Sequence, residues 1–383
     1  MISILTSAIP IALGISIVLY LTKDEPIKHW GIAFFLGSGI GLGINALLFF
    51  IYMHLFPTQE GYSFFLLFAF IGIVPFSALT WYRENKKNIS SFIKEKSKKK
   101  SWDFFFWTFV LTVIIALSSA TFIILTRHNI YGEWDAWTMY TRTARFIFRA
   151  NADWRNAFSP LLMSFHPDYP PLVALNIASG WAVLNDEHIL VPMAVSSIFL
   201  VSTAGLLFTS ILTTQSYRHA VLALGSLLTV KNFIRVGVAQ YADIPLAFFI
   251  LATIVILYIN SIAQKNKLFV LAGITAALAA WTKNEGALFA LTTSLALLVV
   301  HYKNLNNTFK WYLLGLLFPI IILIFFKATL APANDLFVDP EKQLLLLLDM
   351  ERNKMITTSF IKSFSGWGSW IVFILYGFIM KIN

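Results

Sequence analysis

The sequence lacks cysteine altogether and is poor in charge. Its 383 residues contain no Cys, which excludes disulfides, thiol catalysis and metal sites built on thiolates. Only 13% of the residues are charged and 58% are hydrophobic, whereas about a quarter of the residues of an ordinary soluble domain are charged. This composition excludes a soluble globular protein.

What the sequence has instead is a series of long apolar blocks. Many approach the roughly 20 residues that an α-helix needs to cross about 30 Å of hydrocarbon. The blocks are continuous and do not alternate, which excludes a transmembrane barrel. The first block has no basic leader and no small-residue cleavage site, so we expect a retained helix. The sequence therefore predicts an all-α, polytopic membrane protein with about 11 transmembrane helices, near residues 3–21, 30–52, 62–82, 102–126, 189–211, 219–232, 243–262, 268–283, 285–301, 311–330 and 366–381.

Positive charge is concentrated in one segment. The net charge is +10, and residues 83–101 hold eight Lys or Arg against two Glu. Spread over a soluble surface, this charge would suggest nucleic acid, but a basic loop between spans is typical of the cytoplasmic side. We therefore predict membrane lipids and no nucleic acid as partners. The next span then delivers residues 127 to about 188 to the extracytoplasmic face.

The segment 127–188 is polar and too interrupted to cross the membrane. Apolar residues alternate with Arg142, Arg145 and Arg149 over 136–150, which predicts a helix along the interface. The apolar stretch 170–184 has only 15 residues, so we interpret it as interfacial or re-entrant. We expect three parts: an N-terminal segment 1–101, a core 102–303, and a C-terminal segment 304–383. The last contains the outer loop 331–365 with the run Leu344–Leu348.

Four polar clusters meet the outer face in this topology. Ionisable groups at membrane depth cost several kcal/mol unless they are paired or hydrated, so they indicate function. Each cluster also has an ordinary interpretation: a solvated turn, a helix N-cap, a lysine that snorkels to the interface, a loop histidine, or arginines that bind lipid headgroups. The clusters are Glu133 with Asp135, His166 with Asp168 and Tyr169, Gln240 with Asp243, and Lys283 with Glu285.

In order along the chain, these motifs resemble the GT-C glycosyltransferases. The resemblance covers about residues 102–300. It consists of a long exit helix, a Glu-x-Asp element in an outer loop, a Tyr-Pro-Pro-Leu helix, an Ala-Asp-Ile-Pro-Leu-Ala-Phe-Phe span and a Thr-Lys-Asn-Glu-Gly turn. It is closest to the bacterial branch that looks like dolichyl-phosphate-mannose protein mannosyltransferases and the lipid A aminoarabinose transferase. Three predicted spans precede the resembling region.

The resemblance implies a sugar transferase of the bacterial inner membrane with its active site on the extracytoplasmic face. Its donor would be a polyprenyl-phosphate-linked sugar and its acceptor an extracytoplasmic glycan, lipid or protein. By the family's pattern, Asp135 is the catalytic carboxylate with Glu133 as its partner. The second acidic element falls on Asp243, and the basic residue ahead of a Gly turn falls on Lys283.

The chemistry of transfer is consistent with these assignments. A half-buried carboxylate can act as the base for an acceptor hydroxyl, because burial raises its pKa. A phosphate leaving group needs no general acid, but it needs cations, and we assign Lys283, Arg142 and Arg145 to it. Direct displacement with one base would invert the anomeric centre. We assign His166, Asp168, Tyr169 and Glu285 to substrate binding.

Other interpretations stay open at this point. We assign no metal ligand, although a divalent ion on Glu133, Asp135 and Asp243 is chemically compatible. A lipid or glycan transporter or flippase would use the same charges to line a passage, but the two related halves with broken helices that are common in transporters are not evident. A surface-polysaccharide polymerase or ligase would share the compartment and the lipid carrier.

Overall fold

The structure is a computed structural model that describes residues 2–22, 30–56, 58–94, 102–300, 302, 305–334 and 339–364. All regular structure in these residues is helical, and several helices are long and apolar enough to span a membrane. The predicted all-α, polytopic membrane fold is therefore confirmed. The last predicted span, 366–381, and the lysines Lys98, Lys99 and Lys100 lie outside the described residues.

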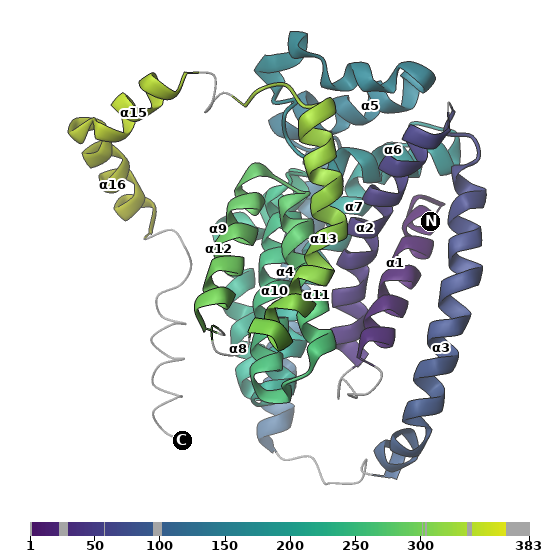
Figure 1. Cartoon of the computed structure of the whole chain (residues 1–383). Coiled ribbons are helices and arrows are strands. Elements are labelled where there is room, and N and C mark those ends of the chain that lie inside the picture. The colour runs from purple at the N-terminus through teal and green to yellow at the C-terminus, as the bar shows by residue number, and fades with distance from the viewer. Residues whose placement is uncertain are drawn as a thin grey trace.

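Long helices run side by side and form a bundle (Figure 1). The helices are long because their apolar runs are not interrupted by charge and can pack on one another in lipid. The bundle contains α1(Ile2–Leu21), α2(Trp30–Leu55), α3(Tyr62–Lys94), α4(Trp102–His128), α7(Leu190–Thr214), α8(Tyr217–Leu228), α9(Lys231–Val238), α10(Asp243–Ala263), α11(Asn266–Ala280), α12(Asn284–Val300) and α13(Leu305–Thr329).

Six helices among the described residues are long and apolar enough to cross a membrane, and α8 with α9 forms a seventh candidate that is bent by 65°. Apart from 366–381, each predicted span corresponds to a helix, because its continuous apolar run dictates one. Helices α11 and α12, and the segment Thr6–Leu21 of α1, are apolar but shorter than these candidates. The number of 11 spans therefore stays a prediction.

The two ends of the bundle differ. Helix α3 ends and α4 begins at the lower end in Figure 1, whereas α5 lies at the upper end. Residues 83–94 of the basic segment form the last turns of α3, and the polar segment 127–188 begins in the last turn of α4. The described part of the basic segment and the polar segment thus lie at opposite ends of the bundle, which is the arrangement that the charge pattern predicts.

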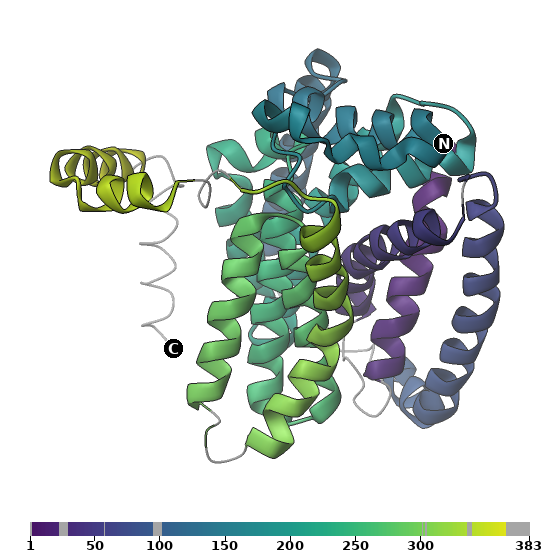
Figure 2. The same ribbon diagram turned by 45° about the horizontal axis from the view of Figure 1, so that its top comes forward.

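Short helices form a layer over the upper end, which Figure 2 turns toward the viewer. The predicted interfacial helix 136–150 is present as a π-helical turn, η1(Ala136–Tyr140), followed by α5(Thr141–Ala150). A π-helical turn at this place is notable because such turns are frequent at functional sites. The layer continues through η2(Asn151–Phe158), η3(Pro160–Phe165) and α6(Leu172–Leu184).

Helix α6 is buried in the protein along most of its length, from Leu172 to Trp181. Its polar residues are satisfied inside the bundle: Asn45 of α2 donates to Asn176 and to Ser179, both at 2.9 Å, and Tyr62 of α3 donates to Asn45 at 2.8 Å. Hydrogen bonds of this kind hold membrane helices together. Helix α6 therefore anchors the layer of short helices to the bundle and is not exposed at the lipid surface.

The outer loop after α13 carries two further helices, α15(Pro340–Leu348) and α16(Met350–Phe364). They stand to one side of the bundle, near the end that carries α5 (Figures 1 and 2). Leu344, Leu345, Leu347 and Leu348 are exposed. An amphipathic helix with exposed leucines is typical of the membrane interface.

Candidate active site

Two turns that are far apart in the sequence pack on each other at the upper end of the bundle. The backbone N–H of Glu133 donates to the carbonyl of Ala239 at 3.1 Å, and Gln240 Nε2 donates to the carbonyl of Ile130 at 3.1 Å. Gly132 has φ +76°, and a Cβ there would lie 2.7 Å from the carbonyl oxygen of Ala239. Only glycine fits this backbone and this contact without strain. The packing brings Asp135 close to the first turn of α10.

Asp135 is half-buried at the start of η1. Burial and the neighbouring Asp243 carboxylate raise the pKa of Asp135 above its usual value, and Lys283 and His166 act in the opposite direction. The effects of Asp243, Lys283 and His166 on Asp135 mean that four separate segments meet here. This convergence is what the sequence motifs lead us to expect of one reaction centre. A carboxylate with a raised pKa in such surroundings is typical of a general base.

Lys283 lies at the centre of this cluster. Its Nζ is 3.3 Å from Asp243 Oδ1 and 3.5 Å from Glu285 Oε1, and it lies 5.9 Å from the centre of the Tyr169 ring. Burial of the ammonium favours its neutral form, but Asp243 and Glu285 outweigh burial and raise the pKa of Lys283. Lys283 is therefore a fixed cation in this site.

The turn between α11 and α12 positions Lys283. The N–H of Gly286 donates to the carbonyl of Lys283 at 3.0 Å. A Cβ on Gly286 would lie 1.9 Å from the carbonyl oxygen of Ala279, so the close approach of the two helices requires glycine. The Thr-Lys-Asn-Glu-Gly motif is thus explained locally by the geometry of this helical hairpin.

Tyrosines surround the carboxylates. The phenol of Tyr140 is buried and contacts the backbone of Ala242, and burial, Asp243 and Asp135 together raise the pKa of Tyr140 well above its usual value. The phenol of Tyr241 contacts the backbone of Asp135. Tyr169 lies beside Lys283, and its ring also contacts that of His166 at 5.0 Å between centres. These phenols are neutral and can donate hydrogen bonds to a substrate.

Asp168 is buried in a network of hydrogen bonds, and its assignment to substrate binding stays a prediction. It is 2% exposed. Its Oδ2 accepts from Asn284 at 2.9 Å and from Asn334 at 2.6 Å, and Lys327 Nζ reaches the Asp168 carbonyl at 2.5 Å and Asn284 Oδ1 at 2.8 Å. Asp168 thus joins the segment before α6 to α12, α13 and the loop after α13. Lys327 ends an apolar run, and no sequence pattern indicated that it would join this network.

Glu133 is directed away from Asp135 toward α9. Arg235 contacts its carboxylate through both Nη2, at 3.0 Å, and Nε, at 3.3 Å. The sequence pattern predicted that Glu133 would be a partner of Asp135. Instead, the Glu133 carboxylate forms a two-point ion pair with Arg235, a residue that the sequence analysis did not single out. The pair fixes the 130–135 turn on α9.

Arg142 is a buried cation that lacks a hydrogen-bond partner. Its Nε, Nη1 and Nη2 atoms are all inaccessible and unpaired among the described residues, and its guanidinium lies 4.2 Å from the centre of the Phe165 ring. Burial lowers the pKa of Arg142. An unpaired buried charge costs several kcal/mol, which is the situation expected of a group kept for an anionic ligand.

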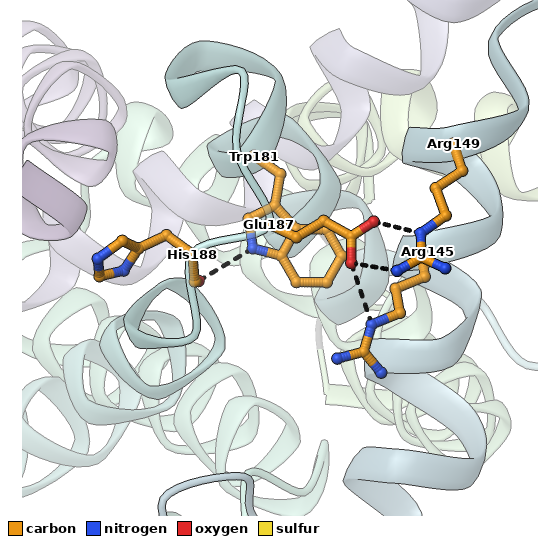
Figure 3. A network of polar contacts seen from close by, with 5 residues as sticks. All are labelled: Arg145, Arg149, Trp181, Glu187 and His188. Atoms are coloured by element: carbon orange, nitrogen blue, oxygen red, sulfur yellow. Dashed lines mark hydrogen bonds and ion pairs between the residues drawn. The ribbon is translucent and has the colours of Figure 1, made fainter.

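Arg145, in contrast, is engaged within the protein. Figure 3 shows the side chains of Arg145 and Arg149 directed at Glu187, which lies between α6 and α7. Arg145 Nε is 3.3 Å from Glu187 Oε2, Arg149 Nη2 donates to the same oxygen at 2.8 Å, and Arg149 Nε contacts Oε1. Of the arginines predicted at the leaving group, Arg142 is unpaired and Arg145 is not.

The carboxylates do not gather around a common point. No group of three or more Asp, Glu and His side chains within the described ranges could hold a metal ion. Glu133 is occupied by Arg235 and Asp243 by Lys283. One ion bridging Glu133, Asp135 and Asp243 therefore does not fit the arrangement of these side chains.

Part of the chain matches a known protein family. Residues 168–326 match the family described as "Dolichyl-phosphate-mannose-protein mannosyltransferase". No curated protein and no solved structure matches the chain. The matched segment includes Asp168, Tyr169, Asp243, Lys283 and Glu285. Through this match the resemblance predicted from the motifs is confirmed, and the chain is similar to the GT-C type of membrane glycosyltransferase.

Proposed function

We propose that the protein transfers a sugar from a polyprenyl-phosphate donor to a hydroxyl group of an extracytoplasmic glycan, lipid or protein. The observation that carries this proposal is the meeting of Asp135, Asp243, Lys283 and Tyr169 at one end of the bundle. A membrane glycosyltransferase of the GT-C type follows from the family match. The donor, the mechanism and the residue roles are our inference from the site.

In the proposed mechanism Asp135 accepts the proton of the acceptor hydroxyl. The acceptor oxygen then forms a bond to the anomeric carbon while the bond from that carbon to the phosphate oxygen breaks, and polyprenyl phosphate leaves. A single displacement with one base inverts the configuration of the anomeric carbon. The raised pKa of Asp135 supports its role, because a base is most effective when its pKa approaches the working pH.

In this proposal Lys283 and Arg142 bind the departing phosphate. Lys283 is held by Asp243 and Glu285, so its ammonium does not have to reorganise when negative charge develops. Arg142 has a full set of free donors, and a guanidinium binds phosphate at two points. Preorganised charge of this kind is often the largest catalytic contribution. Arg142 comes from α5 and Lys283 from the α11–α12 turn, so the phosphate would bridge the outer layer and the bundle.

We place this site on the extracytoplasmic face of a bacterial inner membrane. The basic segment 83–101 supports this orientation, because its residues 83–94 end α3 at the opposite end of the bundle from α5 (Figure 1) and basic loops remain cytoplasmic. The polyprenyl chain of the donor would extend from the headgroup into the bilayer.

The decisive experiment measures the release of polyprenyl phosphate by the purified protein from a polyprenyl-phosphate sugar in the presence of hydroxyl acceptors. Wild type is expected to release it, and Asp135→Asn is expected to be slower by a factor on the order of 10² to 10⁴. Asp153→Asn is the matched control, because Asp153 is an exposed carboxylate in the same outer segment. Equal rates for Asp135→Asn and wild type would remove Asp135 as the base.

A further inference from the structure

A cavity lies beside the turn at 239–243, which also approaches the reaction centre. It has a volume of about 380 Å³ and is bounded by the turn at 130–131, α5, the end of α6, the segment between α6 and α7, the first turn of α7 and Gln240. This volume is within the range of small-ligand pockets, roughly 300–1,000 Å³. Gln240 lines the cavity, whereas Tyr241 and Asp243 approach Asp135. The same turn thus contributes to both sites.

Two buried polar groups that line this cavity have no hydrogen-bond partner. Thr141 is 8% exposed and Gln240 is 4% exposed, and both Thr141 Oγ1 and Gln240 Oε1 are unpaired. Leaving such groups unsatisfied costs about 1–3 kcal/mol each, so their presence at one cavity points to a ligand with hydroxyl groups. Gln240 Oε1 can accept a hydroxyl proton, and Thr141 Oγ1 can donate or accept.

The opening of the cavity carries balanced charge. Arg145 and Glu187 line it together with Asp186, and Arg149 completes the ion pairs with Glu187 (Figure 3). Two arginines therefore face two carboxylates, which leaves no excess of positive charge for an anion. Arg145 reaches Glu187 only through Nε among the described residues, so its terminal nitrogens can donate to a neutral ligand.

We propose that this cavity binds one neutral sugar ring of an extracytoplasmic glycan, at a site separate from the reaction centre. Hydroxyl groups that both donate and accept match the unpaired Gln240 carbonyl, the Thr141 hydroxyl and the Arg145 guanidinium. The site goes beyond the proposed transfer reaction: it would hold a sugar unit of a glycan without contacting Asp135.

Saturation-transfer NMR on the purified full chain tests this directly, in a detergent without a sugar headgroup. The probes are the methyl glycosides of glucose, galactose and mannose, with inorganic phosphate as competitor. At least one glycoside is expected to bind, and Thr141→Val is expected to weaken that binding about tenfold. The variant has nearly the same shape, and it is expected to be at least as stable to heat as wild type, because the hydroxyl that is removed has no partner among the described residues.

Two matched variants distinguish this site from others. Thr138→Val, on the same helical segment but outside the cavity, is expected to bind as wild type does, and so is Asp135→Asn. Binding that is unchanged in Thr141→Val, or lost in Asp135→Asn, would overturn the proposal, as would the absence of binding by any of the three glycosides. Displacement of the glycoside by phosphate would assign the cavity to an anion instead. Because the readout is binding, these outcomes are independent of whether the chain catalyses transfer.

Discussion

At the scale of single residues, the environment distinguishes two carboxylates that are only two positions apart. Asp135 is half-buried beside Asp243 and Lys283, and burial raises its pKa. Glu133 is held by Arg235 through two contacts. An ion pair with an arginine stabilises the charged form of a carboxylate and occupies its oxygens. Two carboxylates of one short motif therefore differ in their surroundings, and these surroundings support the proposed role of base for Asp135 and not for Glu133.

Because the guanidinium of Arg142 is buried and unpaired, we predict that its removal raises stability and lowers activity. Arg142→Met is expected to raise the stability of the protein by about 1 kcal/mol or more, because it removes an uncompensated buried charge. The same change is expected to lower the transfer rate on the order of 100-fold, because a phosphate ligand is lost. Thermal unfolding in detergent and release of polyprenyl phosphate measure the two effects.

Arg155→Met provides the control for Arg142→Met, since Arg155 is an exposed arginine of the same outer layer. It is expected to change neither property appreciably. A loss of stability in Arg142→Met together with full activity would mean that the guanidinium serves packing on Phe165 and not phosphate binding.

The raised pKa of Asp135 predicts the pH dependence of the reaction. A base must be ionised to accept a proton, so kcat/KM is expected to be low in acid and to rise as the pH passes the pKa of Asp135, above the ordinary value of about 3.9. In Asp243→Asn the inflection is expected to move to lower pH, because a neighbouring negative charge that raises the pKa of Asp135 has been removed. An inflection that moves to higher pH would contradict the assignment.

At the scale of elements, the site depends on close approaches between helices and turns. The Thr-Lys-Asn-Glu-Gly turn holds Lys283 because α11 and α12 meet at Gly286. The turn at 130–135 is held by backbone contacts with 239–243 and by the ion pair with α9. A buried carboxylate at Asp168 ties the segment before α6 to α12 and α13. The position of each side chain in these short motifs therefore depends on how whole helices pack on one another.

Gly286→Ala tests the contact between α11 and α12. The new Cβ would lie 1.9 Å from the Ala279 carbonyl oxygen, and backbone atoms cannot move aside cheaply. We expect a loss of roughly 1–3 kcal/mol in stability and a fall in transfer rate as Lys283 is displaced. Thermal unfolding and turnover are the measurements.

Gly72→Ala in α3 is the matched control for Gly286→Ala, because a Cβ at Gly72 would meet nothing within 4 Å. Alanine in a helix interior is favoured over glycine by up to about 1 kcal/mol, so this variant is expected to be unchanged or more stable. If both variants behave alike, close helix packing at Gly286 is not what positions Lys283.

At the scale of the whole molecule, the separation of charge between the two ends of the bundle leads us to expect one orientation in the membrane. Residues 83–101 carry a surplus of six positive charges, and residues 83–94 form the last turns of α3, whereas α5, which follows Asp135 and η1, lies at the other end of the bundle (Figure 1). Because basic loops are retained on the cytoplasmic side, we propose that the site faces outward. The exposed leucines of α15 lie near this same end and are suited to the outer membrane interface.

The absence of cysteine makes this orientation simple to test. Ala152→Cys in the outer layer is expected to react with an impermeant maleimide added to intact cells, whereas Gln215→Cys, in the turn between α7 and α8, is expected to react only after permeabilisation. Both positions are exposed, and wild type provides a background free of thiols. The reverse pattern of labelling would invert the topology and place the proposed site in the cytoplasm.

The sequence by itself determined the class of fold and which ionisable side chains are present to form a site. Apolar runs of about 20 residues cannot satisfy their backbone hydrogen bonds in lipid except as helices, and the basic segment predicts their orientation. The ordered motifs indicated the family and pointed to Asp135, Asp243 and Lys283, because polar groups in such a chain are few.

The tertiary structure decided which of these groups have partners. Glu133 forms an ion pair with Arg235, and Arg145 forms one with Glu187. The guanidinium of Arg142, in contrast, is buried without a hydrogen-bond partner among the described residues. Asp168 is a buried junction that depends on Lys327, 159 positions away. Such pairings were beyond the sequence because charge, burial and hydrogen bonding depend on distances in space, and these are set by how the helices pack on one another.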